Sequence, residues 1–302
     1  MNKYISIFFC VQIIALNLFA MQPKVTPVDY VRPQIDTHKS RWFFFSSASR
    51  PFGMVSLSPD TWTEGSWNSG YLYNSKEIRC FSHVHCWQLA GVPVMPTTGE
   101  VKGHKGMDAY KSTYSHETEI VKPGYHKVEL DTYQIRVELT STSRVGMHRY
   151  TYPAGEKANV LFDVGALLAH GKTEKAAIHR ISSKEIGGYS VLAPTSRRKK
   201  PVTVYFVARF NQNMTAFGGW EKEGKEKKLV HKNSIEGADI GGYASFGKLK
   251  KQTLLMKVGI SYVSEEQARI NLEKELAHWN FDRVKEDAFA EWNRELGKIT
   301  VE

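Results

Sequence analysis

The chain has 302 residues, of which 41% are hydrophobic and 24% are charged. This composition leaves room for one large domain or two small ones, and it excludes disordered, collagen-like and coiled-coil chains. Basic residues outnumber acidic ones by 41 to 31, which gives a net charge of +10, and 12% of the residues are aromatic. The charge and the aromatic content are compatible with an acidic partner and with an aromatic-lined ligand site. Three cysteines cannot form a disulfide scaffold.

The first twenty residues have the features of a signal peptide. Lys3 is their only charge, and residues 4–20 are almost wholly apolar. A membrane anchor is the competing interpretation, but about 17 apolar residues fall short of the roughly 20 that span a bilayer. Cys10 lies inside the apolar run behind bulky phenylalanines, which argues against lipidation. We therefore expect a signal peptide over residues 1–20, no stable membrane span, and an exported protein that is periplasmic, on the cell surface or secreted.

Two cysteines, Cys80 and Cys86, follow the expected signal peptide. If both lie on one extended strand, their Cα atoms cannot come within the roughly 4.4–6.8 Å that a disulfide requires. The spacing favours two buried thiols, although the disulfide state stays open from the sequence.

We expect residues 21–263 to form a large antiparallel β-sandwich, so that the protein is mainly β. Between residues 125 and 262, apolar and polar side chains alternate with a period of two, the pattern of half-buried strands. The clearest runs are residues 135–139, 145–152, 202–210 and 254–262. Turn signals separate the runs, which is typical of sandwiches rather than of βαβ units. The expected turns are residues 153–156, Gly187-Gly188, Gly218-Gly219 and Gly241-Gly242.

Residues 264–302 are expected to form two C-terminal linker helices. The sequence SEEQ at residues 264–267 has the form of a capping box and opens a helix that runs to about Leu276. A second helix starts near Asp282 as N-cap and ends at Gly297.

The second helix carries Val284, Ala288 and Trp292 on one face, and residues 298–302 have the pattern of a strand beginning. We interpret the two helices as a connector to a domain that the chain lacks. Their apolar faces are expected to pack between the sandwich and that domain, which would leave them poorly folded or sticky. Truncation after Val263 should then improve solubility without lowering the melting temperature.

Residues 21–120 are richer in aromatic and turn residues, and we place a ligand surface there because loops at one end of a sandwich commonly carry binding residues. Aromatic faces bind the C–H faces of sugar rings, and neighbouring polar groups bind the hydroxyls. Two aromatic segments, residues 67–71 and residues 83–88, offer this mixture. The candidate substrate-binding residues in them are Trp67, Asn68, Tyr71, His83, His85, Trp87 and Gln88. The alternative is that the large rings are core or cap residues.

Candidate catalytic and metal-binding residues are less specific. On one strand, His83 and His85 would point to the same face, but two histidines without further ligands do not make a zinc site. Nucleophile and phosphate-binding motifs are absent from the sequence. The carboxylates near the aromatic segments are each expected to be solvated. They are Asp60, Glu64, Glu77, Glu100 and Asp108.

Three basic runs lie between expected strands, at residues 197–200, 222–232 and 248–251. Such runs bind nucleic acid or a sulfated polymer in some proteins. Here no aromatic residues alternate with the charges, and an exported chain rarely meets nucleic acid. We expect solvated hairpin tips and no nucleic-acid partner.

Several ordered blocks of the sequence resemble the N-terminal domain of the glycoside hydrolase family 92 exo-α-mannosidases. The main blocks are residues 51–61 (PFGMVSLSPDT), 69–73 (SGYLY) and 81–85 (FSHVH). Residues 28–31 precede these blocks as in the family's opening segment, residues 93–99, 114–119 and 122–125 follow them in the family's order, and residues 263–269 resemble its first linker helix. One departure is RWFFFSSASR at residues 41–50, where many members are rich in glycine and histidine. It suggests a divergent subgroup with a bulkier pocket wall.

The resemblance implies a calcium-dependent, inverting exo-α-mannosidase built from a β-sandwich, two helices and an (α/α)6 barrel. The resemblance implies that the general acid, the general base and most or all of the calcium ligands come from the barrel, so no catalytic or metal-binding residue is assigned here. The N-terminal domain supplies loops to the substrate pocket, including an aromatic residue that contacts the leaving sugar. Trp67 is the first choice for that contact and Trp87 the second.

Two functions therefore compete, together with a weaker third. The first is an inactive N-terminal domain that completes the glycan pocket of a mannosidase barrel, and the second is a free-standing carbohydrate-binding module. A metal hydrolase that uses His83 and His85 is the third. A module should bind mannosides unaided, with binding free energies of roughly −4 to −8 kcal/mol, whereas half a pocket should bind poorly without its barrel.

Overall fold

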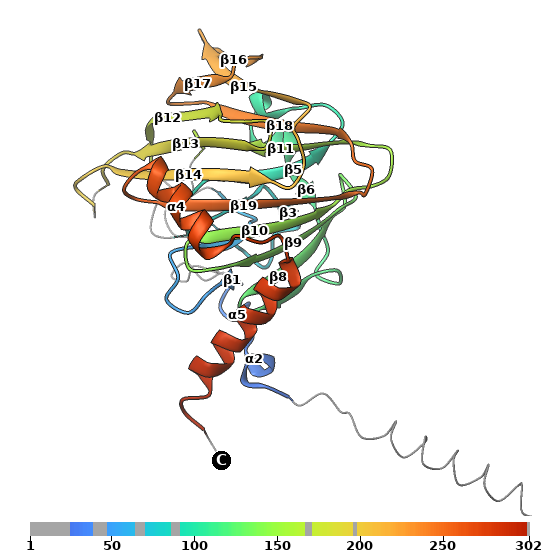
Figure 1. Ribbon diagram of the computed structural model, residues 1–302. Helices are drawn as coiled ribbons and strands as arrows, with labels where there is room; N and C mark the ends of the chain where they lie inside the picture. Colours follow the sequence, from blue (N-terminus) through green and yellow to red (C-terminus); the bar gives the residue numbers. More distant parts are fainter. Residues whose placement is uncertain are drawn as a thin grey trace, which may run out of the picture.

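The computed structural model describes residues 25–38, 47–63, 70–85, 91–166, 171–195 and 198–300. The expected signal peptide lies outside these residues. The described part is mostly β, as predicted, with two packed sheets and two longer helices near the C-terminus (Figure 1). None of the described helices is long and apolar enough to cross a membrane.

Nine of the described strands form the larger sheet, and all their pairings are antiparallel. In spatial order they are β17 (Ser234–Gly237), β12 (Thr173–Arg180), β13 (Glu185–Leu192), β14 (Val202–Phe210), β19 (Thr253–Ser261), β10 (Val145–Thr151), β9 (Ile135–Ser141), β8 (Tyr125–Leu130) and β7 (Ile120–Lys122). The alternating runs therefore predicted β9, β10, β14 and β19 to within about two residues.

The smaller sheet contains eight of the described strands, again antiparallel. Their order is β1 (Ala48–Ser49), β2 (Ser56–Asp60), β4 (Cys80–Ser82), β5 (Val94–Thr98), β11 (Lys157–Phe162), β18 (Gly241–Lys248), β15 (Ala216–Glu223) and β16 (Glu226–Val230). The remaining short elements are β3 (Glu77–Ile78), β6 (Ser112–Thr113), the 3₁₀ turn η1 (Gly103–Lys105), α2 (Pro27–Tyr30) and α3 (Met107–Tyr110).

The main core lies between the two sheets, where their inward side chains are fully buried. Phe162 of β11 stacks on Phe206 of β14 with ring centroids 6.0 Å apart, so the two sheets meet face to face. This confirms the predicted β-sandwich and explains the period-two pattern of its strands.

Three of the four predicted turns are wrong, because the glycine pairs lie in strands β13, β15 and β18. These glycines are needed for close packing rather than for chain reversal. A Cβ at Gly188 would lie 2.1 Å from Ala177 O, one at Gly219 would lie 2.2 Å from Gly241 O, and one at Gly241 would lie 2.1 Å from the Trp220 ring. The turn at residues 153–156 is present, with Gly155 at φ +81°.

The first C-terminal helix, α4 (Glu265–Glu275), begins as the capping box predicts. The Ser264 side chain accepts a hydrogen bond from Gln267 N, and Leu276 ends the helix. Just beyond, Lys257 of β19 donates to Leu276 O and lies 3.9 Å from the centroid of the Trp279 ring. Burial, together with the charge of Arg209, lowers the pKa of Lys257 to about 8.

The second helix, α5 (Phe281–Leu296), starts two residues earlier than predicted. Its N-cap is Asn280, whose side chain accepts a hydrogen bond from Arg283 N, while Asp282 instead forms an ion pair with Arg149 of β10. Gly297 ends the helix as predicted, but the expected strand does not begin within the described residues up to Thr300.

Both helices pack on the outer face of the larger sheet, so the sandwich itself already covers apolar side chains that were expected to lie between it and a further domain. A second apolar cluster joins side chains of the sheet and of both helices. Its members are Tyr125, Val145, Met147, Val207, Ala268, Leu272, Leu276, Phe281 and Val284. Farther along α5, Trp292 donates from Nε1 to Ser49 O at 2.7 Å.

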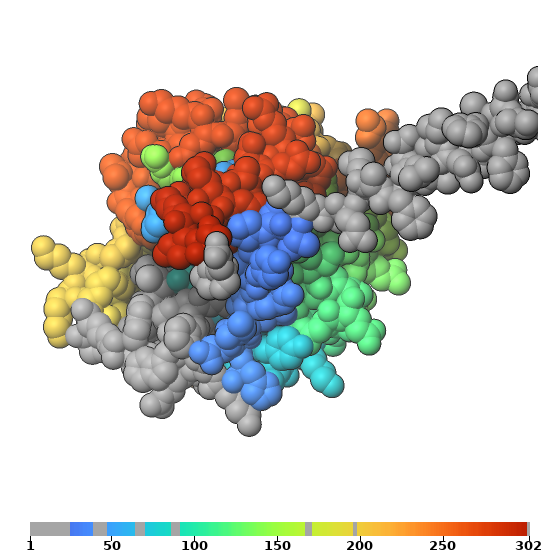
Figure 2. All heavy atoms as spheres, turned by 90° about the horizontal axis from the view of Figure 1, so that it is seen from below, coloured from blue at the N-terminus to red at the C-terminus, as the bar shows by residue number. Residues whose placement is uncertain are grey.

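The segment 25–38 lies beside α5 on the face shown in Figure 2, where the blue and red atoms meet. Asn293 of α5 accepts a hydrogen bond from Val28 N through its side-chain oxygen, and Asp29 pairs with Lys122 at 2.6 Å. The hydrogen bonds from Lys122 and Thr26 hold the pKa of Asp29 well below its usual range. The N-terminal segment, the sandwich and α5 are thus joined at one surface.

We predict that truncation after Val263 destabilises the fold, because it would expose the buried face of Val145, Met147 and Val207. A single Leu272→Ala change should lower the free energy of unfolding by about 2–5 kcal/mol. Urea denaturation followed by circular dichroism measures both changes, with exposed Lys274→Ala as the matched control. Unchanged urea midpoints for the truncated protein and for the Leu272 variant would contradict the observed packing.

Candidate functional site

The two aromatic segments singled out in the sequence begin and end at neighbouring points of the structure. Trp62 and Gly70 form a β-bridge with N···O distances of 3.0 and 2.7 Å, which closes the first segment. His83 N donates to Gly91 O at 2.6 Å and closes the second. Trp67, Asn68, Trp87 and Gln88 themselves lie outside the described residues.

A buried ion pair joins the points at which the two segments begin and end. Asp60 Oδ1, at the end of β2, lies 2.6 Å from Nε2 of His85, and both side chains are at most 2% exposed. A Cβ added to Gly70 would lie 3.6 Å from the His85 ring and 4.0 Å from Asp60, so the backbone of the first segment passes against the pair. The structure therefore brings together the bases of both segments, with Tyr71 adjoining the first and His83 the second.

Asp60 was expected to be a solvated carboxylate, and that expectation is wrong. Its other oxygen accepts hydrogen bonds from the Ser82 hydroxyl at 2.5 Å and from the Cys80 thiol at 3.2 Å. Three donors from the neighbouring chain segment thus replace the water that an exposed carboxylate would bind. Glu77, Glu100 and Asp108 are more exposed, as predicted, and Glu64 lies outside the described residues.

Both nitrogens of His85 face acceptors, since Nδ1 lies 2.6 Å from Ser56 O and Nε2 meets Asp60. The doubly protonated ring satisfies both contacts. Burial alone lowers the pKa of His85, but the charge and hydrogen bond of Asp60 and the bond to Ser56 outweigh it, so that the pKa is raised.

His83 and His85 do not extend from one strand, because β4 ends at Ser82. Instead, the His83 ring reaches across to β10, where it approaches His148 with an Nε2···Nε2 distance of 2.8 Å. A Cβ at Gly146 would lie 2.7 Å from the His83 ring, so glycine leaves the space that this ring fills. The two imidazoles therefore do not extend from one face of a strand, contrary to the prediction.

The buried histidines form a chain of hydrogen bonds with one consistent direction. His83 Nδ1 must donate to Val92 O, which leaves its Nε2 to accept from His148 Nε2. His148 Nδ1 then accepts from the Tyr150 hydroxyl at 2.8 Å. Burial lowers the pKa of His83 to about 4 and that of His148 well below its usual value, so both rings stay neutral.

Cys80 is a free, buried thiol, as predicted for this residue. Burial, with the negative charge of Asp60 beside it, raises its pKa well above the usual value. Its thiolate is strongly disfavoured, which makes Cys80 a structural rather than a reactive cysteine. Cys86 lies outside the described residues.

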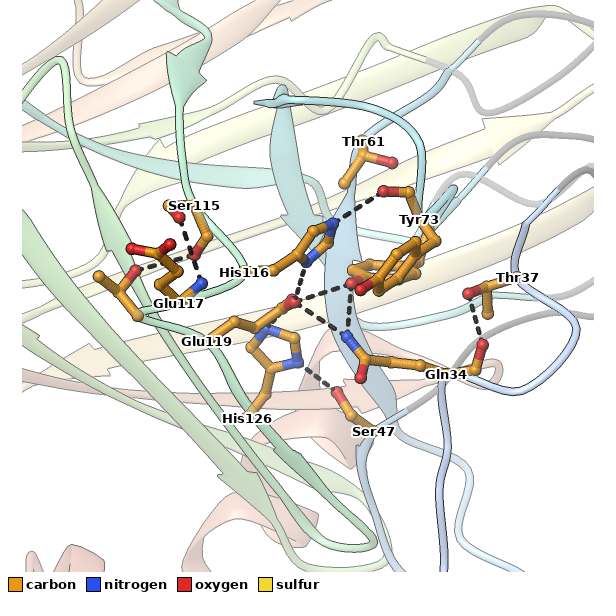
Figure 3. Close-up of polar contacts among 12 residues, drawn as sticks. Gln34, Thr37, Ser47, Thr61, Tyr73, Ser115, His116, Glu117, Glu119 and His126 are labelled. Carbon is orange, nitrogen blue, oxygen red and sulfur yellow. Dashed lines mark hydrogen bonds and ion pairs between the residues drawn. The ribbon is translucent and has the colours of Figure 1, made fainter.

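A second buried carboxylate, Glu119, holds the segment that follows Gly70 (Figure 3). Its Oε2 accepts hydrogen bonds from Tyr71 at 2.8 Å, Gln34 at 3.0 Å and His116 at 2.7 Å. Its Oε1 lies 3.2 Å from Nε2 of His126. Burial would raise the pKa of Glu119, but the contacts of His126, His116 and Tyr71 hold it below its usual value.

The contacts of Glu119 and of its neighbours Tyr71, His116 and His126 join distant parts of the chain to the base of the first aromatic segment. Tyr71 donates to Glu119 and accepts from Gln34 of the N-terminal segment, while His126 of β8 bonds the Ser47 hydroxyl at 2.9 Å. His116 stacks on Tyr73 with centroids 4.0 Å apart and bonds Tyr73 O. Burial and the charge of Glu119 raise the pKa of Tyr71 far beyond its usual value, so it remains a neutral donor.

The described residues contain no group of three or more histidine, cysteine, aspartate or glutamate side chains that could hold a metal ion. The predicted substrate-binding residues Tyr71, His83 and His85 are buried and hydrogen-bonded within the protein. Sequence reasoning did not single out Gln34, Glu119 or His148. The only signal for Glu119 was its place in the block at residues 114–119 that carried the family resemblance.

We predict that stability falls as the pH drops from about 6.5 toward 4, because the unfolded chain binds protons there that neutral His83 and His148 do not. Each histidine should remove roughly 1.4 kcal/mol per pH unit in this window. The raised pKa of His85 makes stability fall as the pH rises, but only above pH 6.5, so it does not affect this window. Urea titrations across the window should show a shallower slope for His148→Gln than for the exposed control His231→Gln. Equal slopes would contradict the neutral histidine pair.

Comparison of the sequence with known families and proteins identifies its relatives. The sequence profile of the glycosyl hydrolase family 92 N-terminal domain matches residues 30–261, and the profile of the family's catalytic domain matches residues 267–302. An uncharacterized secreted glycosidase of Arthroderma benhamiae is 24% identical over 287 residues, which cover 85% of this chain and 36% of the relative.

Solved structures give the same result. A family GH92 α-mannosidase from Bacteroides thetaiotaomicron has a TM-score of 0.81 at 29% identity, covering 93% of this chain and 40% of that chain. A family GH92 inverting mannosidase from the same species shares the fold, with a TM-score of 0.76 at 22% identity and coverage of 93% and 38%. This chain thus spans about 40% of the length of these relatives or less. It belongs to glycosyl hydrolase family 92, through the N-terminal domain of that family.

Proposed function

We propose that this chain is the glycan-contacting N-terminal part of an exo-α-mannosidase, and that it completes the substrate pocket of an (α/α)6 barrel. The observation that supports this most directly is the convergence of the two aromatic segments on the Asp60–His85 pair. Two loops that start from one rigid base can present their side chains to a single ligand. The mannosidase relative at 29% identity supports the substrate class.

Within this proposal, the predicted site residues divide into two roles. Trp67, with Trp87 as second choice, stacks against a mannose ring, and Asn68 and Gln88 hydrogen-bond its hydroxyls. Tyr71, His83 and His85 hold the bases of the two loops, a role supported by their burial and their internal hydrogen bonds.

The general acid, the general base and the calcium requirement belong, in this proposal, to the barrel. Calcium takes six to eight oxygen ligands, and the described residues offer no group of three or more histidine, cysteine, aspartate or glutamate side chains that could hold it. Export is part of the proposal as well. It rests on the apolar first twenty residues and on the fungal relative's description as secreted.

The chain alone should have no mannosidase activity, because the general acid and the general base are proposed to lie in the barrel. Acid–base catalysis contributes about 10²–10⁴-fold to the rate of such reactions. The assay uses aryl α-mannosides and mannobioses with calcium present, and calorimetry with methyl α-mannoside tests binding. Turnover that one carboxylate substitution in this chain abolishes would contradict the proposal. Unaided binding of the mannoside would instead favour a free-standing carbohydrate-binding module.

Trp67→Ala should weaken substrate affinity without loss of stability once the chain is combined with a family 92 barrel. A loop ring held for ligand contact can be removed cheaply, whereas truncation of a core tryptophan costs about 3–5 kcal/mol. Fully buried Trp220→Ala is the control for the cost of losing a core ring. A Trp67 variant that unfolds as readily as the control, or that keeps full mannoside turnover, would transfer the contact to Trp87.

A further inference from the structure

The basic run at residues 248–251 forms part of a groove that the proposed function does not use. The groove has a volume of about 690 Å³ and lies between the β14–β15 and β18–β19 connections. Its lining residues are Asn211, Gln212, Asn213, Lys248, Lys250, Lys251 and Thr253. Among the described residues, three amides and three ammonium groups line it, and no carboxylate does.

This groove lies at the opposite end of the smaller sheet from the candidate site. The second aromatic segment leads into β5, where Val94 pairs with Phe162 of β11, and Phe162 in turn pairs with Gly242. At the other end of the same two strands, Lys157 pairs with Lys248. A ligand in the groove is therefore distinct from a sugar at the Asp60–His85 end.

The three lysines differ from Lys227, Lys228 and Lys232 of the neighbouring basic hairpin in how their charge is balanced. In the β15–β16 region, Lys227 pairs with Asp239, Lys228 with Glu223 and Lys232 with Glu221, at 2.5–2.8 Å. Across the described part of the chain, no carboxylate oxygen lies within 4 Å of the ammonium groups of Lys248, Lys250 or Lys251. The groove therefore carries positive charge that no described carboxylate compensates.

The backbone around the groove is well anchored. Leu249 packs against the main core between the exposed lysines, and Gln252 O accepts a hydrogen bond from Tyr152 N at 2.7 Å. On the opposite wall, Asn211 accepts from Leu255 N and Gln212 donates to Thr253 O. The lysines are therefore presented from a fixed turn, which reduces the entropy that binding would cost.

We propose that this groove binds a polysaccharide that carries sulfate or phosphate esters, as a second glycan contact of the chain. Ammonium and amide donors without a carboxylate suit a tetrahedral anionic ester. None of the described residues that line the groove is aromatic and could stack on a base, which disfavours nucleic acid. The choice of a glycan as the carrier of the ester rests on the proposed function.

The test measures binding of the full chain to fluorescein-labelled dextran sulfate and dextran phosphate by anisotropy, with plain dextran and single-stranded DNA alongside. Both charged dextrans should bind in about 50 mM salt and be released near 300 mM, where the screening length is much shorter. Comparison of the two dextrans identifies the preferred ester. Plain dextran should not bind.

Lys248→Gln, Lys250→Gln and Lys251→Gln together should weaken binding about 100-fold, at roughly fivefold per lysine. The matched control removes the same charge from paired lysines, by Lys227→Gln, Lys228→Gln and Lys232→Gln, and should change the affinity less than fivefold. Thermal midpoints of both variants should stay unchanged, since these side chains lie at the surface.

Equal losses in the two triple variants would overturn the proposal, because binding would then follow net charge alone. Tighter binding of DNA than of either charged dextran, salt-independent binding, or no binding in low salt would also overturn it. The dextrans contain no mannose, so this result does not depend on whether the mannoside site of the proposed function is correct.

Discussion

The Asp60–His85 ion pair is the contact on which the candidate site depends most. It joins the end of β2 to the chain that leaves β4, and it lies against Gly70, where the first aromatic segment returns. Both partners are fully enclosed, so removal of either would leave a buried charge without its counterion, a change that typically costs about 3–5 kcal/mol. The Ser82 hydroxyl and Ser56 O complete the pair's hydrogen bonds. A small polar centre thereby fixes the described ends of the two aromatic segments.

The C-terminal helices extend this rigid base to the other sheet. Arg50, directly after β1, donates to Ser141 O of β9, to Val284 O and to Glu291 of α5. With the Trp292 contact to Ser49 O, it fixes the direction of α5 relative to the loop bases. Residues 267–302 match the family's catalytic-domain profile, yet the helices described within this range bury apolar side chains against the sandwich. In the proposed enzyme, these helices would orient a barrel against the loops rather than tether it flexibly.

The sequence predicted those features that depend on local patterns. Alternation along residues 135–139 and 202–210 specified strands, and the capping box at Ser264 specified the start of α4, because each pattern is read within a few residues. Buried polar contacts could not be predicted in this way. Asp60 sits in a Ser-Pro-Asp-Thr sequence that is typical of a turn, and its burial is explained only by His85, which comes 25 residues later in the chain. The turns predicted at the strand glycines were wrong for the same reason. Glycine is required there because partners distant in the sequence, such as Ala177 and Trp220, leave no room for a Cβ.

The distribution of charge follows from how each part of the sandwich is stabilised. At the candidate site, Asp60 is buried and paired with His85, and Glu119 is buried and paired with His116 and His126, so that the ionic contacts of this region are used to fix the backbone. At the opposite end, Lys248, Lys250 and Lys251 hold nothing in place, because Leu249 and the Gln252 carbonyl already anchor the turn. Charges that are not needed for the fold, and that no nearby carboxylate neutralises, remain available for a ligand. The excess of basic residues in the composition is therefore concentrated, in part, at a surface where the fold does not require it.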